Sequence, residues 1–316
     1  MNNINIPNPR IVDVSASNRE ARFCPEDFIK EAERRYHGSI GQLALQARRR
    51  GSRILLVAGP SGSGKTTTAR KLCEAFQALG KNAQMVSLDD FYLPRHLLPR
   101  LPDGEPDFET VDGLDIEKIH SCLGELLSQG ASEFPVFSFH EQEEPAKTRH
   151  IQLGKNDYLV IEGIHALNPI ISQGLGREGI MKVYLNALTS FRIGDTEVFS
   201  PRSIRMVRRM VRDFHFRGAS ISFTLSLWDK VCQGEERYIN PYAGEADAVL
   251  DTTHEYEPHI FHNFLFPILM EADPDPQWIG LLQNLVETFD QFYDLPQGYV
   301  PRDSMLREFI GWDQVF

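Results

Sequence analysis

A glycine-rich run early in the chain carries the clearest chemistry. Residues 59–66, GPSGSGKT, match the pattern G-x-x-x-x-G-K-[ST] at every fixed position. Glycines let successive main-chain N–H groups curl around a phosphate, and the start of the following helix adds partial positive charge. In this pattern Lys65 neutralises the β- and γ-phosphates and the Thr66 hydroxyl ligates Mg²⁺. The residues expected to contact a nucleoside triphosphate are Gly59, Pro60, Ser61, Gly62, Ser63, Gly64, Lys65, Thr66 and Thr67.

Acidic side chains follow two of the expected strands. Asp89 and Asp90 end the segment 83–88, and Glu162 ends the segment 158–161. Ligands of a parallel sheet bind at the carboxyl ends of its strands. Phosphoryl transfer needs carboxylates that hold Mg²⁺ and accept the proton of the attacking hydroxyl. We expect Glu162 to hold the metal, and Asp89 to accept the proton while also facing the metal. Asp90 is more typical of a strand-end turn.

Residues 200–217 form the conspicuous basic element, with six arginines and one acid. Arg202, Arg205, Arg209 and Arg212 recur at intervals of three and four, so they share one face of a helix. Guanidinium groups neutralise the oxygens of a moving phosphoryl group in planar, bidentate fashion. The alternatives are a solvated helix face or a nucleic-acid contact.

The phosphate-binding pattern alone does not separate kinases from ATPases, GTPases or motors. GTPases need a guanine-reading element of the NKxD type, and the sequence has none after the segment 181–185. ATP is therefore the expected donor.

Strands that alternate with helices must position these groups. Such alternation predicts βαβ units and a parallel sheet. We expect an α/β fold of the P-loop NTPase type, with three layers, a central parallel sheet, a small hairpin and lid region, and added N- and C-terminal helices. The expected strands are 53–58, 83–88, 158–161, 181–185 and 248–251, with a hairpin at 134–139 and 148–153. The expected helices are 26–50, 64–79, 115–129, 200–216 and 220–233, with several more between 258 and 310; 92–114 should be loop.

Composition narrows the class of protein. The chain has 316 residues, 41% of them hydrophobic, and a formal net charge of -11, which argues against a general nucleic-acid or anionic-membrane binder. Its four cysteines form no CxxC pair and no disulfide framework, which fits a reducing compartment. The polar N-terminus is no signal peptide, and no apolar run of about 18 residues occurs. We expect a cytoplasmic protein with no membrane contact.

No linker separates two domains. We expect residues 1–50 to be an N-terminal arm and helix, with 1–20 a loose arm, and 51–255 to be the core, with a lid around 200–220. Residues 256–316 should extend the same domain with helices. His254, His259 and His262 lack metal-site spacing, and His165 is either a pocket residue or a packed one. The sequence leaves open whether the chain forms a homo-oligomer.

Four segments together carry a family resemblance. The P-loop, SLDDFY (87–92), IEGIH (161–165) and RRMVRDFHFRG (208–218) resemble the uridine kinase and phosphoribulokinase family of P-loop kinases. The closest resemblance is to bacterial uridine-kinase-like nucleoside kinases, supported by GEERYINPYAGEAD (234–247) and SMLREFIG (304–311). We expect no counterpart of the threonyl-tRNA-synthetase-like region that often precedes those kinases.

The resemblance implies roles for particular residues. Asp89 is the implied base for a ribose 5′-hydroxyl and touches Mg²⁺, with Thr66 and Glu162 completing the metal site. Tyr92 lies beside the nucleoside, and Phe108 and Glu109 fall where a Phe–Asp pair contacts base and ribose. Arg209, Arg212 and Arg217 fall on the lid and its approach, where they hold phosphates and acceptor.

The sequence departs from the family pattern on the acceptor side. Phe137 stands where a tyrosine usually reads the pyrimidine, and Gln142 where a histidine is expected. Glu144 replaces an arginine, for which Arg149 is a nearby substitute, and Ala219 replaces the second lid arginine. These changes leave the phosphate-binding residues intact and alter the wall that reads the base.

The leading hypothesis is an ATP- and Mg²⁺-dependent kinase of a nucleoside resembling uridine or cytidine, with a small molecule as acceptor. Its expected catalytic residues are Asp89, Lys65, Arg212 and Arg217; its acceptor residues are Tyr92, Phe108, Glu109, Phe137 and Arg209. One alternative is a kinase of another small alcohol, such as a sugar phosphate or a pantothenate-like acceptor. The other is an ATP-binding regulatory or RNA-associated protein.

Overall fold

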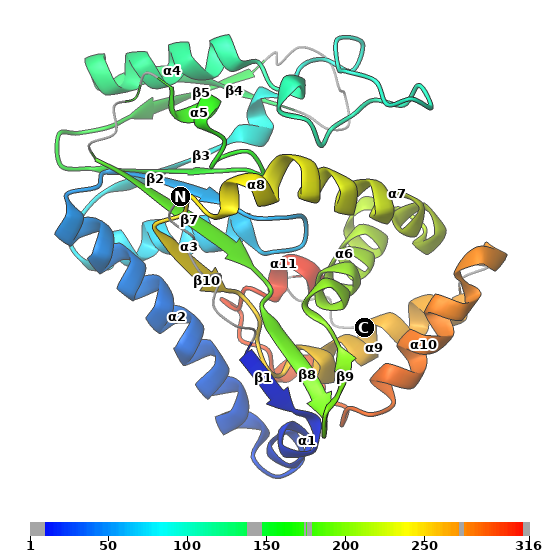
Figure 1. Cartoon of the computed structure of the whole chain (residues 1–316). Helices are drawn as coiled ribbons and strands as arrows, with labels where there is room; N and C mark the ends of the chain where they lie inside the picture. Colours follow the sequence, from blue (N-terminus) through cyan, green and yellow to red (C-terminus); the bar gives the residue numbers. More distant parts are fainter. Residues whose placement is uncertain (1–9, 138–146, 174, 176–178, 272–274, 312–316) are drawn as a thin grey trace.

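The computed structural model has a five-stranded parallel sheet at its centre (Figure 1). It describes residues 10–137, 147–173, 175, 179–271 and 275–311. In spatial order the strands are β10 (Ala248–Asp251), β7 (Ile180–Asn186), β2 (Ile54–Ala58), β6 (Tyr158–Glu162) and β3 (Ala83–Ser87). All five predicted strands are confirmed, as is the α/β class with a parallel sheet.

The sheet separates two hydrophobic layers. Along β2, Leu55 and Val57 face one side of the sheet while Leu56 and Ala58 face the other, and all are fully buried. This alternation follows from the two-residue period of a strand, and burial on both faces explains why β2 is an uninterrupted apolar run. Helices therefore have to cover both faces, which gives the predicted three-layer fold.

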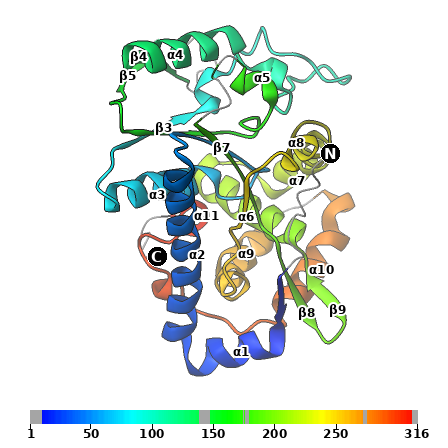
Figure 2. The ribbon, with the colours of Figure 1, turned by 60° about the vertical axis from the view of Figure 1, so that its left-hand side comes forward.

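Helices on one face come from both ends of the chain, and those on the other from its middle (Figures 1 and 2). The first face carries α2 (Pro25–Arg50) and α3 (Lys65–Ala78), which pack against each other. The second face carries α4 (Ile116–Gln129), α5 (Pro169–Ser172) and the antiparallel hairpin of β4 (Ala131–Val136) and β5 (Lys147–Gln152). The helices and hairpin predicted here are confirmed to within a few residues.

The prediction of a loose N-terminal arm is wrong for the residues that the structure describes. Residues 10–20 are not loose: they form β1 (Arg10–Asp13) and most of α1 (Val14–Phe23), while residues 1–9 lie outside the described part. β1 pairs in parallel with β8 (Thr189–Ile193), which continues nearly in line from β7 and pairs with β9 (Thr196–Phe199) (Figure 1). Local sequence did not reveal this small sheet, because the partners of β1 lie 179 residues further along the chain.

Four helices from residue 201 onwards gather beside the first face of the sheet (Figure 1). The helix α6 (Pro201–Arg217) packs against α7 (Ile221–Gly234), α9 (Glu257–Glu271) and α11 (Arg307–Ile310). The remaining helices are α8 (Asn240–Ala243) and α10 (Ile279–Phe289), and a π-helical turn, Glu235–Ile239, joins α7 to α8. The division into residues 1–50, 51–255 and 256–316 stays a prediction.

Candidate active site

The phosphate loop connects β2 to α3, as its sequence predicts. Gly62 and Gly64 adopt the left-handed backbone region, with φ of 77° and 78°. A Cβ added to Gly64 would lie 2.7 Å from the Met305 sulfur, and one added to Gly62 would lie 2.8 Å from the Arg205 carbonyl oxygen. Both backbone conformation and space therefore require glycine here. The loop is consequently enclosed by α6 on one side and by the C-terminal segment on another.

Thr66 and Glu162 come together at the carboxyl edge of the sheet. Register places Val57 opposite Glu162 and Ser87 opposite Glu162, so the ends of three strands converge. The Thr66 hydroxyl donates to Glu162 Oε1 at 3.3 Å, and the Ser87 hydroxyl donates to the same oxygen at 2.7 Å. Ser87 was not among the predicted site residues, although it lies two residues before Asp89. Its hydroxyl orients the carboxylate expected to face the metal.

Two buried carboxyl groups share this edge. Burial, together with the neighbouring charge of Asp89, raises the pKa of Glu162 to about 7. Burial likewise raises the pKa of Asp89, while the positive charges of Lys65, Arg217 and Arg212 oppose the shift. The carboxylates and cations singled out by sequence therefore lie close enough to affect one another's pKa. Lys65 itself donates to the Pro60 carbonyl oxygen at 3.2 Å.

Hydroxyl and carboxylate oxygens are the donor set that Mg²⁺ prefers. Thr66 and Glu162 already lie within hydrogen-bond distance of each other, so they fit a shared cation. Within the described residues, no three His, Cys, Asp or Glu side chains converge into a metal cage of their own.

One acid organises three arginines of the predicted lid. The Asp213 carboxylate lies 3.2 Å from Arg209 Nε, 2.7 Å from Arg212 Nη2 and 3.5 Å from Arg217 Nη1. It is largely buried, whereas Arg217 remains more than half exposed. Three cations therefore converge on one anion, which leaves the cluster with excess positive charge near Asp89. Sequence analysis noted this acid among the arginines of the helix without giving it a role.

Two further arginines of α6, Arg205 and Arg208, hold the phosphate loop, whereas the half-exposed Arg202 pairs with Glu236 at 3.5 Å. Arg205 donates to the Ser61 carbonyl oxygen at 3.1 Å and pairs with Glu235 at 2.7 Å. Arg208 is completely buried and donates to the Gly62 carbonyl oxygen at 3.0 Å. Arg205 and Arg209 meet the loop at the same residue, since Arg209 Nη1 donates to the Ser61 hydroxyl at 2.9 Å.

The expected acceptor residues lie side by side. The Tyr92 ring lies 5.7 Å from that of Phe108, edge to face, and 6.1 Å from that of Phe137. The Tyr92 hydroxyl donates to the Phe108 carbonyl oxygen at 2.7 Å. Burial raises the pKa of Glu109 to about 7, against the lowering effects of Arg209 and Lys65. An aromatic wall with one carboxylate thus lies beside the phosphate loop.

Other residues considered in the sequence make separate contacts. Asp90 accepts from the Phe137 N–H at 3.3 Å, and Arg149 donates to the Met85 carbonyl oxygen at 3.0 Å. Ala219 follows the helix end, and its N–H donates to the Asp213 carbonyl oxygen at 3.0 Å. Gln142 and Glu144 lie outside the described residues.

The histidines singled out earlier also separate in space. His165 is buried against the ring of Tyr238, which favours its packed interpretation. His254, His259 and His262 contact different groups: Glu33, the Ser17 hydroxyl and Asp294 respectively.

Comparison with known proteins decides the family. Residues 54–257 match the model of the Phosphoribulokinase / Uridine kinase family. The chain belongs to this family. Its similar relatives include the uridine kinase of Lactobacillus helveticus, 25% identical over 209 residues, which cover 63% of this chain and 90% of the relative. The uridine-cytidine kinase B of Dictyostelium discoideum is 26% identical over 198 residues, covering 62% and 73%. This member of the family is accordingly an ATP-dependent kinase.

Solved structures of the family resemble the chain more loosely. The phosphoribulokinase from Rhodobacter spheroides is 14% identical, with a TM-score of 0.43 over 82% of this chain and 99% of its own. A possible uridine kinase from Bacillus stearothermophilus is 17% identical, with a TM-score of 0.41 over 63% and 89%. These values carry no argument about the acceptor.

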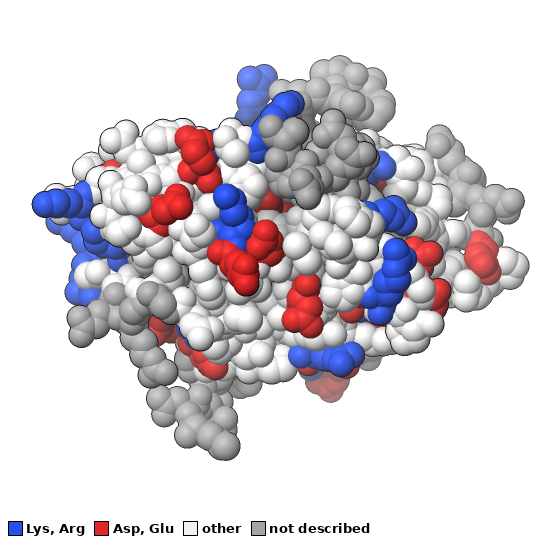
Figure 3. Space-filling view, turned by 90° about the horizontal axis from the view of Figure 1, so that it is seen from above, with Lys and Arg blue, Asp and Glu red and all other residues white. Residues whose placement is uncertain are grey.

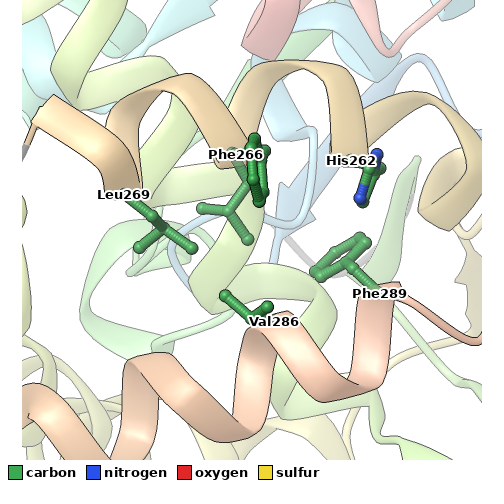
Figure 4. Close-up of a pocket in the computed structure, with 6 residues that line it drawn as sticks. His262, Phe266, Leu269, Val286 and Phe289 are labelled. Atoms are coloured by element: carbon green, nitrogen blue, oxygen red, sulfur yellow. The ribbon is translucent and has the colours of Figure 1, made fainter.

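Two surface features lie apart from this kinase site. On the face in Figure 3, acidic and basic side chains are scattered among uncharged ones over most of the view, and several basic side chains gather at its left-hand edge. A small apolar pocket of about 10 Å³ lies between α9 and α10, lined by His262, Leu265, Phe266, Leu269, Val286 and Phe289 (Figure 4). It has room for no more than a water-sized group.

In the described part of the chain, no helix combines the length and apolarity needed to cross a bilayer.

Proposed function

We propose that this kinase transfers the γ-phosphoryl group of ATP to the hydroxyl of a nucleoside resembling uridine or cytidine. The observation that supports this most is the grouping of Asp89 with Lys65, Arg212 and Arg217 beside the phosphate loop. A purely regulatory ATP-binding protein needs no proton acceptor at that position. The names of the relatives, uridine kinase and uridine-cytidine kinase, support the acceptor class.

In the proposed mechanism each group of residues has one task. The main-chain N–H groups of residues 61–67 hold the phosphates of ATP. Asp89 takes the proton from the acceptor hydroxyl as the hydroxyl oxygen attacks the γ-phosphorus. The bond between the γ-phosphorus and the β–γ bridging oxygen breaks, and ADP leaves with that oxygen. Lys65 and Arg212 neutralise the charge on the transferring group, where such cations have their largest effect.

Arg217 also neutralises the charge on the transferring phosphoryl group, from the exposed side of the lid. Mg²⁺, held by Thr66, Asp89 and Glu162, supplies charge neutralisation to the phosphate oxygens when it is bound.

The aromatic wall is the proposed acceptor site. Tyr92, Phe108 and Phe137 offer ring faces and edges to a planar base, and Glu109 accepts hydrogen bonds from ribose hydroxyls. Arg209, which donates to the Ser61 hydroxyl of the loop at 2.9 Å, also lowers the pKa of this carboxyl group. Because Phe137 has no hydroxyl, it reads a base by packing alone. The runner-up is a kinase of another small alcohol, favoured by this same loss of a polar contact.

An acceptor panel tests the proposal. The protein is incubated with ATP and Mg²⁺ and with uridine, cytidine, purine nucleosides, sugar phosphates or pantothenate, and ADP formation is followed. We expect uridine or cytidine to raise ADP formation well above that with ATP alone. A response to sugar phosphates or pantothenate only would support the runner-up, and no response to any acceptor would contradict the kinase mechanism.

Two variants test the assigned base. Asp89→Asn should lower kcat by about 10²–10⁴-fold, the usual contribution of a positioned general base. Asp229→Asn removes an exposed carboxylate on α7 and should leave kcat unchanged. Equal kcat values for the two variants would show that Asp89 is not the proton acceptor.

A further inference from the structure

The segment 300–311 lies against the phosphate loop, although it is far beyond the residues matched by the family model. Its helix α11 packs on α6 near the middle of the molecule (Figures 1 and 2). The Met305 side chain fills the space beside Gly64, and the Phe309 ring lies 5.2 Å from the Arg208 guanidinium carbon. The C-terminal segment is therefore part of the surroundings of the nucleotide site.

Hydrogen bonds within the segment hold its conformation. The buried Arg307 guanidinium donates to the carbonyl oxygens of Val300, Pro301 and Gly311. The Ser304 hydroxyl lies 3.0 Å from the buried Tyr256 hydroxyl. Arg307 thus ties the start of segment 300–311 to its end. The backbone between these points is held in place, so the side chain that follows Arg307 has a defined direction.

That side chain is Glu308, and its carboxylate reaches the loop. Glu308 Oε2 accepts the main-chain N–H of Thr67 at 3.3 Å. The charge of Glu308 also raises the pKa of Glu162, whose carboxyl lies in the expected metal site. Two separate observations thus place this carboxylate at the nucleotide site: a contact on the loop side and an electrostatic effect on the metal side.

Thr67 is the last of the loop residues expected to contact nucleotide phosphate. A carboxylate on its N–H occupies a donor that a phosphate oxygen would use, and it adds negative charge beside a polyanionic ligand. We propose that Glu308 is an affinity-setting residue of the nucleotide site, which competes with phosphate for the Thr67 amide and so weakens the binding of ATP and ADP. Weakened ADP binding favours product release, a step that limits turnover in many enzymes.

This inference depends on the phosphate loop binding ATP, as the proposed function requires. A merely structural role makes the opposite prediction. If the acid only stabilises the start of α3, its removal loosens the loop and weakens nucleotide binding or leaves it unchanged. If it competes with phosphate, its removal strengthens binding. The sign of the change separates the two.

The experiment measures dissociation constants for ATP·Mg and for ADP by titration calorimetry, using the whole chain. Glu308→Gln removes the charge and keeps the shape, and Glu308→Ala removes the contact altogether. Glu287→Gln makes the same charge change at an exposed position on α10 and serves as control. Unfolding temperatures without nucleotide establish that each variant is folded.

We expect both Glu308 variants to bind ATP·Mg about tenfold more tightly than the unaltered chain, which corresponds to about 1.4 kcal/mol. The gain should shrink as salt rises, because Glu308 is only partly buried and ions screen its repulsion of the phosphates. Glu287→Gln should bind like the unaltered chain. Unchanged or weaker binding by folded Glu308 variants would overturn the proposal while leaving ATP binding intact. Absence of ATP binding in every folded protein would instead contradict the proposed function, and this proposal with it.

Discussion

Arg208 and Gly62 are joined by a hydrogen bond of 3.0 Å from the guanidinium Nη1 to the main-chain oxygen. The same guanidinium makes a two-point contact with Glu257 at 2.6 and 2.8 Å and donates to the Thr252 carbonyl oxygen at 2.9 Å. Arg208 and Glu257 are both fully buried. The phosphate loop is therefore fastened through one side chain to α6, to the end of β10 and to the start of α9.

Removing Arg208 should destabilise the protein strongly. Arg208→Met leaves the Glu257 charge buried without its partner, which costs about 3–5 kcal/mol of unfolding free energy. Arg202→Met, on the same helix but with a half-exposed side chain, should cost less than about 1 kcal/mol. Urea unfolding measures both.

A double variant isolates the buried charge as the cause. Arg208→Met combined with Glu257→Met removes both charges and should recover part of the loss. Equal losses in the single and double variants would contradict this explanation.

Asp213→Asn should impair catalysis through the lid arginines. Without the central carboxylate, Arg212 and Arg217 lose the anion that holds them together, and their guanidinium groups move apart. We expect kcat with uridine as acceptor to fall by roughly 10²-fold, the effect of displacing a catalytic group by about 1 Å. Steady-state kinetics measures the change, with Asp195→Asn in the exposed β8–β9 turn as control. A normal kcat for Asp213→Asn would show that the cluster does not position these arginines.

Glu109→Gln should stabilise the protein at neutral and higher pH. Burial raises the pKa of Glu109 from 4.5 to about 7, so the folded state keeps this proton more tightly than the unfolded state. The resulting stability is fully present below pH 4.5 and is lost as the pH rises to 7. A glutamine does not ionise, so the variant should gain roughly 1–2 kcal/mol at pH 8, allowing for solvent screening, and nothing at pH 4.

Urea unfolding at the two pH values provides the measurement for Glu109. The same variant should raise the KM for uridine, because glutamine is the weaker hydrogen-bond acceptor for ribose. A stability difference independent of pH would rule out ionisation of Glu109 as the cause.

Tyr36→Phe tests a link between α2 and the helix of the phosphate loop. The buried Tyr36 hydroxyl lies 2.7 Å from the Thr68 hydroxyl, which in turn donates to the Gly64 carbonyl oxygen at 2.7 Å. Loss of the phenolic hydroxyl should cost about 1 kcal/mol of unfolding free energy. Tyr299→Phe, at an exposed ring, should cost nearly nothing. Chemical denaturation of the two variants would reveal no difference if the Tyr36 hydroxyl contributed nothing.

Much of the core fold follows from local patterns. The five central strands are short apolar runs with β-branched residues, and the helices between them carry apolar residues at a period near 3.6. Parallel strands bring their carboxyl ends to one edge, so the sequence predicted that Thr66 and Glu162 lie at the same edge, where they meet. The phosphate loop was evident because its chemistry depends on residues adjacent in sequence.

Contacts between distant segments depended on the tertiary structure. The sequence placed six arginines in one basic helix, but packing buries Arg208 on Gly62 and leaves Arg217 beside Asp213. The pairing of β1 with β8 and the approach of Glu308 to Thr67 likewise join segments far apart in the chain. A helical period tells which residues share a face, but only the elements packed against that face determine whether an arginine meets a carbonyl oxygen, a carboxylate or the open site.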